Sequence, residues 1–296
     1  GAFVAMAVVV IVLISVLSGG GKTAAGQPIP SAPIPANVQS AVTGVTNAQF
    51  TAAGLGGGQV TSSGVFAATP GQPLITDSGK PVLVYEGAEY CPYCAAARWP
   101  LTIALSRFGT FTGLETVGSS PYDVYASTHT FSYAKAKYTS QYLVFDPVEF
   151  ESNVCAGAIS GGQCLAGYKP LQSASTRDAH LMSAYDTEKY FPQDASASAT
   201  AGWIPFMDWG GRFVSSGGAY SPGVINSGNS SSGPWHPMTW DQVIATLKLP
   251  TTGAGQAILG AANVYTGAIC DMTGDQPANV CNTPLIKQVQ SELPKA

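Results

Sequence analysis

The chain carries little charge. Only 10% of its 296 residues are charged, and the 13 Lys and Arg residues are spread thinly against 17 Asp and Glu residues, which leaves a net charge of -4. Because nucleic-acid binding depends on a concentrated basic surface, this composition argues against a nucleic-acid partner. No internal repeat is visible. The 34 glycines and 21 prolines favour many turns and loops over long helical bundles.

The sequence also lacks His and Cys residues at the spacings that metal sites require. The histidines at positions 129, 180 and 236 show no ligand spacing, and only Cys91 and Cys94 form a CxxC pair. A structural zinc site needs about four ligands and usually brings a second such pair. We therefore expect no metal and no cofactor.

The one long uncharged run opens the printed sequence. Residues 2–17 hold no charged side chain and one polar residue, Ser15. A membrane span needs roughly 20 apolar residues, and the sequence starts with Gly rather than Met, so we interpret residues 1–18 as an N-terminally truncated transmembrane helix. The core of a signal peptide is the alternative. Residues 19–37, rich in Gly, Ala and spaced Pro, are expected to form a linker without a core of its own.

Six cysteines fall into three local pairs. Cys155 and Cys164 lie nine positions apart, and Cys270 and Cys281 eleven positions apart, in stretches that contain turn-forming residues. We expect both pairs to be structural disulfides, although six cysteines allow 15 pairings. Disulfides persist only in oxidising compartments. The body of the protein is therefore expected on the extracytoplasmic (periplasmic) side of the cell membrane, anchored by a single span.

The clearest local pattern is VLVYEGAEYCPYC followed by AAARWPLTIALSRF. It predicts a strand over residues 82–85 and a helix from Cys94, kinked at Pro100. Further along, we expect a second strand over residues 113–120, a helix over 173–191, a hairpin over 206–215 and a capped helix over 239–248. Cys91 then lies where a strand meets a helix N-terminus.

A CxxC pair suits a zinc site, a structural disulfide or a redox centre. The placement at a helix N-terminus favours the redox centre, because unpaired N–H groups and the helix dipole lower the pKa of a thiol there. Cys91 would be the exposed thiolate that attacks, and Cys94 would resolve the mixed disulfide. Arg98 would add positive charge nearby. The structural disulfide stays open as the alternative.

The strand, the Ala88-Glu89-Tyr90 triplet and the CxxC together resemble the thioredoxin superfamily. The wider pattern, with THTFSYAKAKYTSQYLVFDPVE and AICDMTGDQPANVC, looks like a DUF929-type protein, a group of thioredoxin-like membrane or exported proteins of archaea and actinobacteria. The Ala/Gly/Thr-rich, Lys-poor composition suits an actinobacterial source.

The resemblance implies an α/β fold with a thioredoxin-like mixed sheet flanked by helices. This domain would span residues 38–296, with an insertion at about 121–200 and a C-terminal helical extension at about 252–292. Pro205 would lie in the loop that faces the cysteines and presents backbone groups to a substrate. The position of the buried acid of many thioredoxins holds Tyr85, and Glu86 or Glu89 would assist proton transfer instead.

Two functions follow as expectations. The first is an anchored oxidoreductase that exchanges thiols and disulfides with exported proteins. The second is a non-catalytic accessory subunit of a membrane or cell-envelope complex, such as a transporter or an assembly machine, in which the thioredoxin-like body is a scaffold. A soluble ligand-binding role is a weaker third possibility.

Overall fold

The computed structural model describes residues 26–60, 66–192, 203–227 and 235–295. The expected transmembrane helix at residues 1–18 and the first part of the linker lie outside these ranges. Within them, no helix combines the length and the apolar character that crossing a membrane requires.

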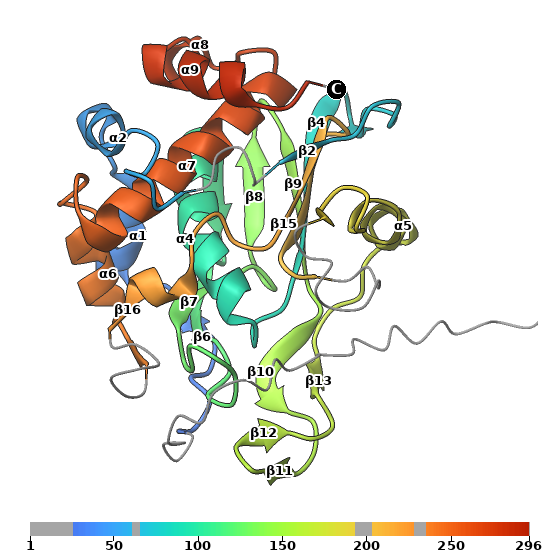
Figure 1. Ribbon diagram of the computed structural model, residues 1–296, viewed down its shortest axis with the longest axis vertical. Helices are drawn as coiled ribbons and strands as arrows, with labels where there is room; N and C mark the ends of the chain where they lie inside the picture. Colours follow the sequence, from blue (N-terminus) through green and yellow to red (C-terminus); the bar gives the residue numbers. More distant parts are fainter. Residues whose placement is uncertain (1–25, 61–65, 193–202, 228–234, 296) are drawn as a thin grey trace, which may run out of the picture.

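A six-stranded mixed sheet forms the centre of the molecule (Figure 1). Its middle strand, β4 (Lys80–Gly87), runs parallel to β9 (Val144–Glu149) and antiparallel to β14 (Phe206–Trp209). The other strands are β15 (Phe213–Ser216), which forms a hairpin with β14, then β2 (Ala67–Ala68) beside β15, and β3 (Thr76–Asp77), which pairs with the start of β4. The hairpin expected over residues 206–215 is confirmed.

Helices cover both faces of this sheet. Figure 1 shows α4 (Pro92–Leu105) and α7 (Gly253–Met272) on one side and α5 (Thr176–Tyr185) on the other. Alternation along β4 matches this arrangement, because Leu83 and Tyr85 belong to the large core under α4 and α7, whereas Val82 and Val84 belong to a smaller core with α5. We call these the α4 face and the α5 face.

Helix α7 packs against α4. The expected helix at 239–248 exists as α6 (Trp240–Thr246), capped by Thr239 as its sequence indicates, but it lies against α1 and α7. Small residues along α7, such as Gly260 and Gly267, allow other segments to approach closely, since a Cβ at Gly260 would lie 2.3 Å from the backbone of Gly56. The 20-residue α7 is buried along nearly its whole length.

The strand expected over residues 113–120 is present, but it does not belong to the central sheet. Residues 115–118 form β6 (Glu115–Gly118), which pairs with β1 (Ala32–Pro33) and β7 (His129–Ser132) in a separate three-stranded sheet. The strand that lies parallel to β4 is β9, inside the segment 121–200 that was expected to be an insertion. Strands β5 (Gly109–Thr112) and β8 (Lys137–Ser140) form a further pair between α4 and β9.

The described part of the expected linker does not stand free of the body. The carbonyl of Ile29 accepts hydrogen bonds from Asn153 Nδ2 at 2.6 Å and from the Gly118 N–H at 3.4 Å, and Ala32 pairs with Thr116 in the three-stranded sheet. The spaced prolines explain this outcome, because they hold the chain extended and so suit it to the edge of a sheet.

A two-stranded arm projects from the sheet at the lower end of Figure 1. It consists of β10 (Glu151–Cys155) and β13 (Tyr168–Pro170), with β11 (Ile159–Ser160) and β12 (Gln163–Cys164) at its tip. The remaining elements are α1 (Ala36–Thr43), α2 (Asn47–Ala53), the short 3-10 helix η2 (Pro222–Ile225), β16 (Asn226–Ser227), β17 (His236–Pro237), α8 (Ala278–Cys281) and α9 (Pro284–Glu292).

Candidate redox site

The CxxC pair lies at the start of α4, as the sequence predicts. Cys91 is the N-cap residue of the helix, and its Sγ accepts a hydrogen bond from the Cys94 backbone N–H at 3.3 Å. Pro92 occupies the first helical position, where a missing N–H is harmless because no carbonyl of the helix would accept it. The helix then continues through Pro100 to Leu105.

The six cysteines divide as expected. Cys155 is bonded to Cys164 at the tip of the arm, and Cys270 is bonded to Cys281, which joins α7 to α8. Cys91 and Cys94 are both free thiols. The CxxC pair is thus set apart from the two structural disulfides. A search of the described ranges finds no cluster of His, Cys, Asp or Glu suited to hold a metal ion.

The loop before β14 faces Cys91. The Cys91 thiol donates a hydrogen bond to the Ile204 carbonyl over 3.6 Å, and the Ile204–Pro205 peptide bond is cis. The carbonyl of Pro205 accepts the Gly217 N–H at 2.9 Å, which ties the loop to the end of the β14–β15 hairpin. Pro205 therefore lies beside the CxxC pair, next to a carbonyl that already contacts the thiol.

The expectation of an exposed, acidic Cys91 is wrong for this structure. Cys91 is only 5% exposed and Cys94 is fully buried. Burial raises the pKa of the Cys91 thiol well above its usual value, and contact with Cys94 adds to the rise, whereas the Cys94 N–H opposes it. The helix N-terminus is present, but desolvation outweighs its effect on the thiol.

Aromatic side chains pack against the pair, and the charge of one carboxylate reaches it. Tyr90 stacks on Tyr168 at the base of the arm, with ring centroids 4.1 Å apart, and the Tyr168 hydroxyl donates to Ser120 Oγ at 2.9 Å. Asp123, in the loop after β6, is close enough for its charge to raise the pKa of Cys91. Burial raises the pKa of Asp123 itself to about 6. Sequence analysis did not identify Asp123, and a lone acid in a turn-rich loop gave no signal for it.

Neither glutamate expected to assist proton transfer contacts the cysteines. Glu89 accepts hydrogen bonds from Ser31 Oγ at 2.9 Å and Ser132 Oγ at 2.6 Å, which anchor it to the three-stranded sheet and the segment before it. Glu86 points to the α5 face, away from α4, as the alternation along β4 predicts. Its environment raises its pKa to about 8, through burial first and then through Asp178, Asp186 and Asp146.

An ion pair lies on the α4 face instead. Arg98 of α4 donates from Nε to Glu149 Oε1 at 2.9 Å and from Nη2 to Glu149 Oε2 at 2.5 Å, and both side chains are fully buried. Nη2 also donates to the Ala88 carbonyl at 2.6 Å. Burial alone would lower the pKa of Arg98, but Glu149 raises it well above its usual value. Sequence analysis placed Arg98 near the site and missed Glu149.

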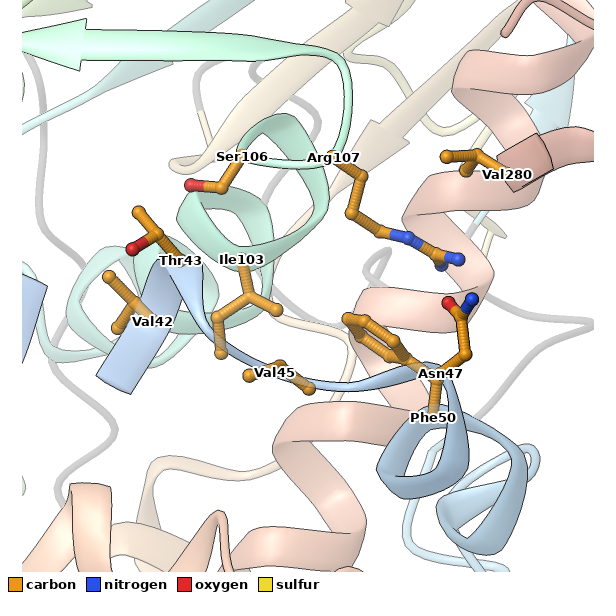
Figure 2. A pocket seen from close by; sticks show the side chains of 9 residues that line it. All are labelled: Val42, Thr43, Val45, Asn47, Phe50, Ile103, Ser106, Arg107 and Val280. Carbon is orange, nitrogen blue, oxygen red and sulfur yellow. The ribbon is translucent and has the colours of Figure 1, made fainter. Parts of the chain in front are cut away.

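The cavity shown in Figure 2 lies at the other end of α4. It has a volume of about 170 Å³, and Ile103, Ser106 and Arg107 contribute to its wall together with α1, α2 and α8. Arg107 lies over the Phe50 ring at 4.2 Å and donates to Thr266 Oγ1 at 3.2 Å. Because α4 separates it from Cys91 and Cys94, this cavity is not part of the redox site.

Comparison with known families places the chain. Residues 71–271 match the family described as "Domain of unknown function (DUF929)", and the chain belongs to that family. The matched region includes the CxxC pair, Arg98, Glu149 and Pro205. Searches of curated proteins and of solved structures found no match.

Proposed function

We propose that the protein is a thioredoxin-like thiol–disulfide oxidoreductase that acts through Cys91 and Cys94. The observation that carries the proposal is the state and setting of this pair: two free thiols at the start of α4, while the other four cysteines form disulfides, with the Cys91 thiol against the Ile204 carbonyl. A CxxC pair at a helix start is typical of redox centres. The strand order β9-β4-β14-β15, with the CxxC after β4 and the proline loop before the hairpin, supports the thioredoxin-like assignment.

The exchange follows from the two sulfurs. The Cys91 thiolate attacks one sulfur of a substrate disulfide, that disulfide breaks, and the second substrate sulfur leaves as a thiolate that takes up a proton. Cys94 then loses its proton and attacks Cys91 Sγ, which releases the first substrate sulfur. Two electrons pass from the dithiol to the substrate. The reverse sequence oxidises a substrate dithiol.

A substrate must first gain access to the buried Cys91 thiol. Since Cys91 is 5% exposed, a substrate sulfur reaches it only after a covering group such as Tyr168 or the Ile204 loop moves. Tyr93, between the cysteines, is 42% exposed, and Trp203, beside Ile204, is 45% exposed. Tyr93 follows Cys91 by two residues, and Trp203 precedes Ile204, whose carbonyl accepts the hydrogen bond of the Cys91 thiol. A substrate that binds them would begin its approach next to the reactive sulfur.

The expected location belongs to the same proposal. We place the body outside the cytoplasm, anchored by residues 1–18, because two disulfides persist best in an oxidising compartment. Exported proteins would then be the substrates. An actinobacterial source stays a prediction from composition.

The test is differential alkylation read by mass spectrometry across a series of glutathione redox potentials. We expect Cys91 and Cys94 to open at less reducing potentials than the two structural disulfides, and Cys91 to be alkylated first. A Cys94→Ser variant should then trap substrates as mixed disulfides, whereas a Cys91→Ser variant, the matched control, should not. If all three pairs resist reduction together, the proposal fails.

A non-catalytic accessory role is the second candidate, and one observation favours it. Both thiols of the CxxC pair are buried, so the pair in this structure resembles part of a core more than an open site. In that case the body would be a scaffold in a membrane or envelope complex. Alkylation of folded protein separates the two, because a scaffold would protect Cys91 at all potentials that leave it folded.

A further inference from the structure

Beneath Cys94 lies a group of buried polar atoms whose hydrogen-bonding capacity is not used. Arg98 Nη1 and the Tyr85 hydroxyl are both buried and have no hydrogen-bond partner among the described residues. Buried donors are almost always satisfied, because a buried donor without an acceptor has lost its bonds to water without replacement. Two of them side by side, with the Arg98 guanidinium carbon 5.9 Å from the centre of the Tyr85 ring, call for a physical reason.

Cys94 lies near both of these donors. Cys94 and Arg98 are four residues apart on α4, so their side chains lie on the same side of the helix. The charge of Cys94 acts on both Arg98 and Tyr85, which places all three within electrostatic reach. Tyr85 reaches this place because residue 87 is glycine: a Cβ there would lie 2.3 Å from the Tyr85 hydroxyl oxygen.

Glu149 holds the guanidinium in position. It engages Nε and Nη2 of Arg98, and Nη2 is further fixed by the Ala88 carbonyl, which leaves Nη1 as the unused donor group. Glu149 also accepts the Tyr133 N–H at 3.4 Å. The fork of the guanidinium matches the carboxylate in two parallel bonds, so its orientation is fixed before any chemistry occurs.

We infer that Arg98, oriented by Glu149, and the Tyr85 hydroxyl form a buried anion-stabilising site for the Cys94 thiolate. A neutral thiol needs little from these donors, and they stay unused while Cys94 is protonated. When Cys94 loses its proton to resolve the mixed disulfide, both donors gain an anionic acceptor. The inference deepens the proposed function and rests on it, since the thiolate of Cys94 matters only for exchange.

Several charged and titratable groups near Cys94 can affect its titration, and they determine which residues the experiment must vary. Cys91 and Arg98 of α4, Tyr85 of β4 and Tyr90 interact with Cys94 directly, whereas Glu149 of β9 and Tyr133, after β7, act on Tyr85 and Arg98. The Tyr133 hydroxyl is already engaged, with Thr102 Oγ1 at 2.8 Å and the Arg98 carbonyl at 3.3 Å. Arg98, Glu149 and Tyr85 are therefore the groups to vary.

The experiment follows the ultraviolet absorbance of the Cys94 thiolate against pH in the full chain with Cys91→Ser, where the other four cysteines are in disulfides. No substrate and no access to the thiol are needed. Arg98→Met should move the midpoint upward by about 1 pH unit or more, a roughly tenfold loss of thiolate below the midpoint. Arg98→Lys should reverse much of that upward shift, because lysine keeps the positive charge although it lacks the planar guanidinium group.

Two further variants should shift the midpoint of the Cys94 titration in opposite directions. Glu149→Gln should move the midpoint downward, because it removes a negative charge that offsets Arg98 while an amide oxygen still accepts one bond. Tyr85→Phe should move it upward by less than Arg98→Met, since it removes a neutral donor. Glu86→Gln is the matched control: a buried glutamate of the same sheet on the α5 face, which should leave the midpoint unchanged.

The outcomes separate this inference from the proposed function. If Arg98→Met, Arg98→Lys and Glu149→Gln all leave the midpoint in place while circular dichroism shows them folded, the anion site is refuted. If Arg98→Met does not fold, Arg98→Lys and Glu149→Gln decide alone, since a purely structural role would not give a downward shift. Failure of disulfide exchange with shifted midpoints would instead refute the proposed function and leave the anion site standing.

Discussion

The two faces of the central sheet each bury one glutamate completely, and they treat it in opposite ways. On the α4 face, Glu149 forms a bidentate ion pair with Arg98. On the α5 face, both oxygens of Glu86 lack a hydrogen-bond partner among the described residues, and the neighbouring charges that act on it are acidic. Both residues are 0% exposed.

The difference shows that burial alone does not decide the charge of a carboxyl group. Desolvation raises the pKa of both glutamates, but Arg98 opposes the rise at Glu149, whereas Asp178, Asp186 and Asp146 add to it at Glu86. The α4 face therefore holds a fixed charge pair next to the CxxC pair. The α5 face holds a carboxyl group that keeps its proton up to a pH of about 8.

The largest effect should come from breaking the pair on the α4 face. Arg98→Met leaves Glu149 buried without its counter-ion, and removal of one partner of a buried ion pair typically costs about 3–5 kcal/mol. We expect a loss of that size in the free energy of unfolding, measured by urea denaturation at pH 7.

A double variant tests the cause of that loss. Arg98→Met combined with Glu149→Leu removes both charges, so it should recover most of the stability that the single variant loses. If the double variant instead loses as much stability as Arg98→Met and Glu149→Leu lose together as single variants, packing at this site, and not the uncompensated charge, causes the loss.

The next effect concerns the α5 face and depends on pH. The pKa of Glu86 is about 8 in the folded protein, above its ordinary value of 4.5, so the folded state binds more protons between these values. The free energy of unfolding should therefore fall by about 5 kcal/mol as the pH rises from about 4.5 to 8, and level off above that. Glu86→Gln should flatten this fall.

Chemical denaturation of wild type and Glu86→Gln at pH 5, 6.5 and 8.5 measures this fall in the free energy of unfolding. Asp208 and Asp123, whose pKa values rise to about 6, contribute below pH 6 in both proteins, so the difference between wild type and Glu86→Gln must be sought between pH 6.5 and 8.5. Parallel curves in that interval would show that Glu86 is not the titrating group.

A third carboxylate refines the comparison, because Asp208 lies on the α5 face with hydrogen-bond donors but no ion pair. It accepts the Gly211 N–H at 2.7 Å and Gln72 Nε2 at 2.5 Å. Burial raises its pKa to about 6, and these bonds oppose the rise. Stability from this group is lost as the pH rises from about 4 to 6.

Asp208→Asn should therefore change the free energy of unfolding by no more than about 1 kcal/mol at pH 7. An Asn oxygen still accepts the Gly211 N–H, and its amide group can donate to Gln72 Oε1, which has no partner. The variant should keep the slope between pH 6.5 and 8.5 that Glu86 causes. A loss of that slope would assign the titration to Asp208 instead.

Sequence patterns predicted the features that local chemistry decides. The capped helix expected over residues 239–248, the hairpin over 206–215 and the two short-range disulfides all appear where residue types and spacing indicated. Alternation along β4 explains why Glu86 faces away from the cysteines, although Glu86 was expected to assist proton transfer there. Each of these depends on residues fewer than about a dozen positions apart.

The misassigned features depend on long-range packing. Both 115–118 and 144–149 have the composition of strands, and only the fold decides which one lies beside β4. Glu149 is 51 positions from Arg98, so no local spacing links them. The burial of Cys91 likewise comes from the Ile204 loop and from Tyr168, which are far away in the sequence.

The smallest effect should come from an ion pair that shares the chemistry of Arg98–Glu149 without its burial. Lys135 Nζ lies 3.1 Å from Glu115 Oε1, but the Lys135 side chain is 73% exposed. Exposed pairs of this kind contribute roughly 0–1 kcal/mol, because water screens the charges and the long side chain loses entropy. Lys135→Met should therefore change the free energy of unfolding by less than about 1 kcal/mol, and 1 M salt should abolish even that difference. The same salt should leave the penalty of Arg98→Met nearly unchanged, since mobile ions do not reach a fully buried pair. Equal salt sensitivity of the two penalties would show that water reaches the α4 face, and the contrast between buried and exposed charges would no longer hold.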